Sequence, residues 1–175
     1  TLARPDSLNA LSTAMMGDLM RQFEQVAADP QCRVVVLAAT GKAFSAGHDL
    51  REMRAQPQLD FYQQMFAQCS QLMLAIQKLP QPVIAQVQGL ATAAGCQLVA
   101  MCDLAVAADT ARFAVSGVNL GLFCATPSVA LSRNLHRKAA FEMLATGDFI
   151  SAQEAKEKGL INRVCVPDQL DSAVD

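Results

Sequence analysis

The sequence lacks the long apolar runs and the clusters of like charge that mark membrane-spanning or nucleic-acid-binding proteins. Its apolar runs extend over only a handful of residues, whereas a spanning helix needs about 20. Its 14 basic and 16 acidic residues are interspersed, which argues against nucleic acid as the main partner. We therefore expect neither a membrane span nor a nucleic-acid partner.

The spacings that hold metal ions or disulfides are also missing. The two histidines, His48 and His136, are far apart, and no cluster of histidine, cysteine and carboxylate surrounds either of them. We therefore expect no metal ion. The cysteines lie in apolar stretches without a CxxC pair, which favours buried thiols in a reducing compartment over a disulfide framework. They are Cys32, Cys69, Cys96, Cys102, Cys124 and Cys165.

Two motifs of common enzyme classes are absent. No G-x-G-x-x-G run with an acidic ribose partner occurs, so no redox cofactor is expected. Ser45, in "KAFSAGH", could be considered as a nucleophile. Its surroundings lack the G-x-S-x-G elbow, however, and no His–Asp relay is evident in the sequence.

The 175 residues fit a single domain, residues 1–175, and 52% of them are hydrophobic. That content predicts either a large core or a surface that belongs to a partner interface. The chain begins at Thr1 and ends with "QLDSAVD", which reads like the first turn of another helix. We therefore expect it to be an internal piece of a longer protein.

Hydrophobic periodicity predicts alternating helices and strands. Residues 12–28, with Ser12 as N-cap, and residues 60–79 carry the apolar stripes of amphipathic helices. Residues 33–39 form a β-branched run typical of a strand covered on both faces. Further strands are expected at 83–88, 103–108, 111–115 and 160–166. Further helices are expected at 95–102, within 127–147, and at 151–159. In the last of these helices Ser151 and Glu154 form a capping box, and Gly159 ends the helix. The alternation predicts an α/β fold with parallel pairing.

Two loops of small residues share one design. "AFSAGHDL" (43–50) and "GLATAAGC" (89–96) each follow a buried strand and lead into a helix. The first N–H groups of a helix lack intrahelical partners, and small residues allow a ligand to approach the backbone closely. Two such N–H groups that converge on one point would hold an oxyanion. The alternative is that the glycines only make tight turns.

Both loops, together with "LARPDSLNALS", "PVIAQVQGLATAAGCQLVAMCDLAVAADTARFAVSGVNLGL" and "ATGDFISAQEAKEKGLINRV", resemble the crotonase (enoyl-CoA hydratase/isomerase) superfamily. The resemblance covers essentially the whole chain in the family's order. It implies a spiral of ββα units, an acyl-CoA thioester as ligand, and no cofactor beyond the coenzyme A of the substrate. It also implies a homotrimer or hexamer, a C-terminal helical region missing here, and a location in the bacterial cytoplasm or the eukaryotic mitochondrion.

The resemblance also implies the site residues. The backbone N–H groups of His48 and Ala94 would form the oxyanion hole, and Asp49 would hold the first loop. The His48 side chain would be a pocket wall without a catalytic role, with proton transfer as the alternative. Lys42, or Arg4, Arg51 and Arg54, would meet the phosphates of coenzyme A or, alternatively, be solvated surface charges. The implied substrate-binding set is Ser7, Leu8, Phe44, Ala46, Asp49, Leu50, Gly95 and Leu120.

The sequence departs from the family at its two catalytic glutamates, which would fall at Gln97 and Gly117. An amide does not take up or release a proton at neutral pH, and glycine has no side chain. Cys96 and Cys124, the nearby nucleophile candidates, are more simply explained as structural thiols. Two hypotheses follow: an acyl-CoA enzyme of the hydratase type with an unusual proton-transfer arrangement, or an acyl-CoA-binding paralogue without turnover.

Overall fold

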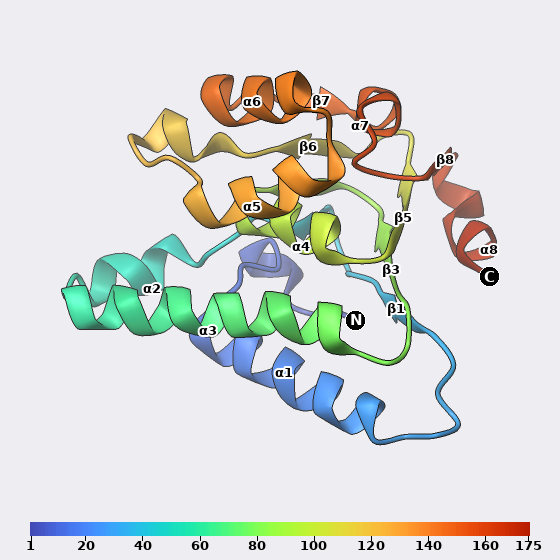
Figure 1. Cartoon of the computed structure of the whole chain (residues 1–175), viewed down its shortest axis with the longest axis horizontal. Coiled ribbons are helices and arrows are strands. Elements are labelled where there is room, and N and C mark those ends of the chain that lie inside the picture. The colour runs from blue at the N-terminus through green and yellow to red at the C-terminus, as the bar shows by residue number, and fades with distance from the viewer.

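The computed structural model describes all of residues 1–175 and contains two four-stranded sheets (Figure 1). In the first sheet β1 (Val35–Leu37), β3 (Val83–Val87), β5 (Leu104–Ala108) and β8 (Arg163–Cys165) pair in that order, all parallel. The second has the order β2 (Ala43–Ser45), β4 (Leu90–Thr92), β6 (Arg112–Ala114) and β7 (Ile150–Ser151), parallel except for the antiparallel pair β6–β7.

The chain passes from the first sheet to the second three times, from β1 to β2, from β3 to β4 and from β5 to β6, and a helical segment follows each time. This repetition is the expected spiral of ββα units. The helices are α1 (Thr13–Ala27), α2 (Leu50–Ala55), α3 (Leu59–Lys78), α4 (Ala94–Met101), α5 (Ala125–Asn134), α6 (Arg137–Thr146), α7 (Ala152–Lys158) and α8 (Leu170–Val174), with 3-10 turns η1 (Pro5–Ser7), η2 (Ser116–Leu120) and η3 (Pro167–Gln169). None of these helices has the length and apolarity needed to cross a bilayer.

The helix ends follow the local sequence. The Ser12 hydroxyl accepts a hydrogen bond from the Met15 N–H, as the predicted N-cap of α1 requires. The capping box of α7 is formed by Ser151 and Glu154, and Gly159 ends that helix in the left-handed conformation. These observations confirm the predicted caps. The caps could be predicted from the sequence because each depends on contacts within four residues along the chain.

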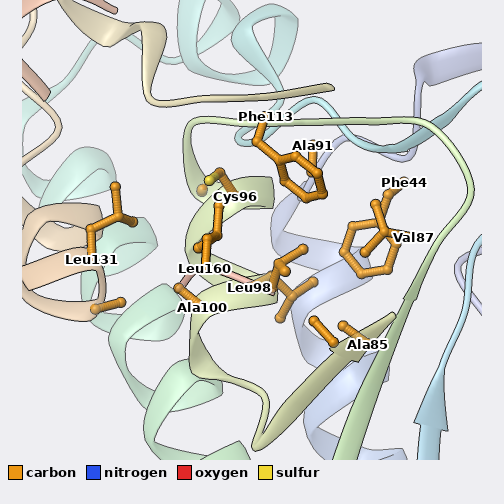
Figure 2. Packing of buried hydrophobic residues seen from close by; sticks show 14 of the residues in the cluster. Phe44, Ala85, Val87, Ala91, Cys96, Leu98, Ala100, Phe113, Leu131 and Leu160 are labelled. Carbon is orange, nitrogen blue, oxygen red and sulfur yellow. The ribbon is translucent and has the colours of Figure 1, made fainter. Parts of the chain in front are cut away.

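The centre of the fold is α4, whose residues from Ala94 to Ala100 are all buried. This helix contacts α3, α5, β2 and β4. In Figure 2 its Cys96 and Leu98 lie among Phe44 of β2, Val87 of β3 and Phe113 of β6, in one hydrophobic cluster that joins both sheets. The first turn of α4 is therefore held from several sides.

The prediction that residues 33–39 form a strand covered on both faces is wrong. Leu37 is buried, but the side chains of Val34 and Val36 are 44% and 40% exposed. The strand β1 is an outer strand of its sheet, pairing with β3 alone, and it is only three residues long. A continuous run of β-branched residues therefore does not show whether the rest of the chain covers one face of the strand or both.

Candidate functional site

The two small-residue loops lie side by side because each contains a short strand, and these strands pair. Ala43 of β2 is in register with Leu90 of β4, and Ser45 is in register with Ala91. A Cβ atom on Gly89 would lie 2.2 Å from the carbonyl oxygen of Lys42, and one on Gly95 would lie 2.2 Å from that of Ser45. Both glycines are therefore required by the close approach of the neighbouring backbone.

The first loop ends against the start of α4. Gly47 has φ +85°, and a Cβ atom there would be 3.0 Å from the backbone nitrogen of Ala94. The next residue is His48. Neither the His48 N–H nor the Ala94 N–H donates a hydrogen bond within the chain. The structure therefore leaves two backbone donors without an intrachain partner, one after β2 and one at the start of α4. Two such groups that point at one place would stabilise an oxyanion.

The turn that presents Ala94 is strained. Ala93, between β4 and α4, has φ 50° and ψ −122°, values that belong to the first central position of a type II′ turn, where glycine predominates. Its N–H donates to the Ala114 carbonyl, which anchors the turn to β6. A non-glycine residue held there costs about 1–3 kcal/mol and indicates a backbone position of functional importance.

The first loop is held by side chains beneath it. Asn9 is fully buried and donates to the carbonyls of Thr40 and Ala43 at 2.9 and 2.8 Å. Its side-chain oxygen accepts from the Arg4 N–H. The sequence analysis did not identify Asn9, because its partners lie 31 and 34 residues away. Asp49 accepts from the N–H groups of Arg51 and Glu52 as the N-cap of α2, the helix that follows the first loop.

Ser45 belongs to the same support. Its side chain is fully buried, donates to the Asn9 carbonyl at 2.9 Å and accepts from the Gly47 N–H at 3.3 Å. No histidine or carboxylate is among its partners. The hydroxyl therefore shapes the turn before His48, and this placement does not support a nucleophilic role.

The His48 side chain points into the protein, where its ring packs edge-to-face on Phe66 of α3 with centroids 5.2 Å apart. Neither ring nitrogen has a hydrogen-bond partner. Burial lowers the pKa of His48, and the charge of Glu52 opposes this effect only in part. The imidazole is therefore neutral at pH 7, and a packing role explains its position.

Gln97 lies in the first turn of α4 and is 4% exposed. It lines a cavity of about 210 Å³ between α3, α4 and α5. Its side-chain oxygen has no hydrogen-bond partner. At this position, where the resemblance implies a glutamate, the cavity is lined by a neutral amide.

Gly117 lies in η2, where no side chain can be accommodated. A Cβ atom would be 2.4 Å from the Leu122 carbonyl oxygen and 2.6 Å from the Cys124 sulfur. The segment from Leu122 to Cys124 therefore fills the space that any side chain at position 117 would need. Burial raises the pKa of Cys124, and it raises that of Cys96 to about 12, so neither thiol is ionised at neutral pH.

We expect Gly117→Glu to destabilise the protein by about 1–3 kcal/mol, because an inserted side chain overpacks this segment. The variant is also expected to leave the hydration rate unchanged. Urea unfolding and an enoyl-CoA hydration assay measure the two effects. Gly17→Glu is the control, since a Cβ atom on Gly17 would meet only the ends of the Gln68 and Arg21 side chains, at 3.5 and 3.6 Å. A stable Gly117→Glu variant with increased hydration would contradict the prediction.

The implied substrate-binding set separates into two groups. Phe44 is fully buried in the core shown in Figure 2, so its side chain presents no surface in this structure. Gly95 faces Ser45 rather than open space. The others surround the first loop or lie exposed: Ser7, Leu8, Ala46 and Asp49 are half-buried, and Leu50 and Leu120 are exposed.

The cations and thiols can also be placed. Lys42, Arg51 and Arg54 are exposed and form no ion pair, and Arg4 donates to the Ser12 hydroxyl.

All six cysteines are free, as expected, but only Cys69, Cys96 and Cys124 are buried. The other three, Cys32, Cys102 and Cys165, are half-buried, which corrects the expectation of buried thiols throughout.

Comparison with known proteins gives a consistent result. The Enoyl-CoA hydratase/isomerase family profile matches residues 1–174. The mitochondrial enoyl-CoA hydratase domain-containing protein 3 of Xenopus laevis is 50% identical over 98% of this chain, and that of Homo sapiens is 50% identical over 93%. The chain spans only 58% and 54% of the lengths of these relatives.

Solved structures match with high similarity. An enoyl-CoA hydratase of Mycobacterium smegmatis superposes with a TM-score of 0.96 at 64% identity, covering 98% of this chain and 66% of that one. Human enoyl-CoA hydratase domain-containing protein 3 superposes with a TM-score of 0.94 at 47% identity, covering 98% and 68%.

Proposed function

Because the chain belongs to the enoyl-CoA hydratase/isomerase family, we propose that it binds an acyl-CoA thioester and holds the thioester oxygen between the N–H groups of His48 and Ala94. The observation that supports this proposal is that both N–H groups lack a partner within the chain, where a Cβ atom on Gly47, the residue before His48, would lie 3.0 Å from the Ala94 nitrogen. Lys42, Arg51 and Arg54 are free to meet the coenzyme A phosphates. The substrate-binding set around the first loop, the trimeric or hexameric state and a mitochondrial or cytoplasmic location belong to the same proposal.

The nominal reaction is hydration of an enoyl-CoA. The two N–H groups would stabilise the enolate oxygen that forms when water adds to the double bond. Addition also requires a proton to leave the water and another to reach the neighbouring carbon. Glutamates supply these transfers in the family, and general acid–base catalysis contributes about 10²–10⁴ in rate. This site offers Gln97 and Gly117 instead.

Binding without turnover is the second candidate function. Two observations favour it: the neutral amide of Gln97 at the cavity, and the space at Gly117 that Leu122 and Cys124 already fill. Such a protein would keep the carbonyl cradle and lack the proton carriers.

Calorimetry with acyl-CoA thioesters and an enoyl-CoA hydration assay, both on the intact protein, separate the candidates. We expect binding, together with a hydration rate lower by about 10²–10⁴ than that of a glutamate-bearing relative. A rate equal to that relative would contradict the binding-only function. Absence of binding by every chain length tested would contradict the proposed function as a whole.

A further inference from the structure

The loop that presents the His48 N–H turns at a residue with little conformational preference of its own. Gly47 has φ +85°, and glycine populates positive and negative φ about equally readily. The peptide unit between Gly47 and His48 is planar, so its carbonyl and its N–H rotate together. Whatever holds the backbone groups of Gly47 therefore decides where the His48 N–H points.

Two hydrogen bonds hold those groups. The Gly47 carbonyl accepts from the Leu11 N–H at 2.8 Å, and the Gly47 N–H donates to the Ser45 hydroxyl at 3.3 Å. In a trans peptide unit the N–H lies opposite the carbonyl, so the His48 N–H points away from Leu11. Of the two partners only the Ser45 hydroxyl belongs to a side chain, and a substitution can remove it without changing a backbone group.

The Ser45 hydroxyl is itself held in one orientation. It is fully buried and donates to the Asn9 carbonyl at 2.9 Å, which uses its single proton. Asn9 is fixed in turn, because its side chain donates to the carbonyls of Thr40 and Ala43. The hydroxyl therefore serves the Gly47 N–H as an acceptor only.

The backbone of Ser45 also borders the second proposed donor. A Cβ atom on Gly95, the residue after Ala94, would lie 2.2 Å from the Ser45 carbonyl oxygen. The pairing of β2 with β4 shifts register between Ala43 and Ser45, and bulges of this kind re-aim groups beside active sites. Ser45 thus contacts the turn before one donor through its hydroxyl and the helix that carries the other donor through its backbone.

We infer that Ser45 is a positioning residue for the bound thioester: its hydroxyl fixes the Gly47 turn so that the His48 N–H points at the ligand oxygen. Without the hydroxyl, the Gly47 N–H is unpaired and the turn can rotate, so the thioester carbonyl is polarised less. This inference rests on the proposed thioester-binding function. It predicts a change in the bound ligand, which a role of Ser45 in stability alone would not produce.

The test is infrared difference spectroscopy of the intact protein with butanoyl-CoA that carries carbon-13 at the thioester carbonyl. Donors at the carbonyl oxygen polarise the C=O bond, and the weakened bond absorbs at lower wavenumber. In Ser45→Ala we expect the band of the bound ligand to lie part of the way back toward its position in free butanoyl-CoA. We expect the affinity to fall by up to about tenfold, as for the loss of one hydrogen bond.

Ser151→Ala is the matched control. It removes the N-cap of α7, where the hydroxyl accepts from the Glu154 N–H. The variant should lower the urea midpoint, as the loss of a cap does, and leave the carbonyl band of the bound ligand unchanged. Ser45→Cys is the second variant at the site, since it nearly keeps the volume and offers a much weaker acceptor. It should move the band in the same direction as Ser45→Ala.

A carbonyl band that stays in both Ser45 variants where it lies in the unmodified protein would overturn the inference. An equal displacement of the band in Ser151→Ala would overturn it as well, because the effect would then follow stability. Failure of butanoyl-CoA to bind to the unmodified protein, or a bound carbonyl band at its position in free butanoyl-CoA, would instead refute the proposed function on which the inference rests.

Discussion

An Ala93→Gly/Ala94→Pro double variant is expected to lose thioester polarisation while keeping its fold. Ala94 is the first residue of α4, a position where proline is favoured because the N–H makes no intrahelical bond. The substitution therefore removes the proposed donor and little else. Losing one oxyanion donor lowers a catalysed rate by about 10²–10³, and the affinity for a saturated acyl-CoA should fall about tenfold.

Ala93→Gly alone is the control for this experiment. A residue that precedes proline is sterically restricted, and glycine relieves that restriction at the φ of 50° found there. The single variant should bind acyl-CoA normally and be more stable by up to about 1 kcal/mol, because the strained alanine is replaced. If the double variant retains full affinity and rate with an unchanged thermal midpoint, Ala94 N–H is not a donor to the ligand.

Gly95→Ala is expected to destabilise the protein by about 3 kcal/mol or more. Its Cβ would lie 2.2 Å from the Ser45 carbonyl oxygen and 2.8 Å from the Ser45 Cβ. Backbone is on both sides of this contact, so relief requires α4 to move away from β2, and overpacking of this kind is among the most damaging single changes. Urea unfolding measures the effect.

Gly17→Ala provides the matched comparison. Gly17 lies inside α1, and a Cβ there would meet the ends of the Gln68 and Arg21 side chains at 3.5 and 3.6 Å. Alanine should stabilise that helix by about 0.5–1 kcal/mol. A Gly95→Ala variant as stable as Gly17→Ala would show that the small residue at 95 is not needed for packing.

Local sequence signals predicted the parts of the fold that depend on local contacts. The ends of α1, α3 and α7 follow from periodicity and from caps such as Ser12 and Ser151. The strands β2 and β4 were not distinguished from loops, because each has three residues, mostly small, and no alternation to detect. Only their pairing, across more than 40 residues, defines them.

The candidate site was predicted in part. The resemblance led to His48 and Ala94, and the structure brings the two loops together. The sequence did not reveal why the two glycines are needed. Gly89 and Gly95 leave room for the backbone of residues 42 and 45, which lie more than 40 residues away along the chain. The burial of Phe44 was not evident for the same reason, since all three residues of β2 are buried by parts of the chain distant in sequence.

The pairing of β2 with β4 also bears on the distance between backbone groups of the two loops. Adjacent strands in a sheet are about 4.8 Å apart. Two N–H nitrogens at that separation, each about 2.9 Å from a shared oxygen, subtend an angle of about 110° at it. That angle suits an oxygen with two lone pairs. The proposed donors, His48 and Ala94, follow the ends of β2 and β4 by three and two residues. If they keep the strand spacing, their separation matches a single carbonyl oxygen, and no side chain needs to adjust to receive it.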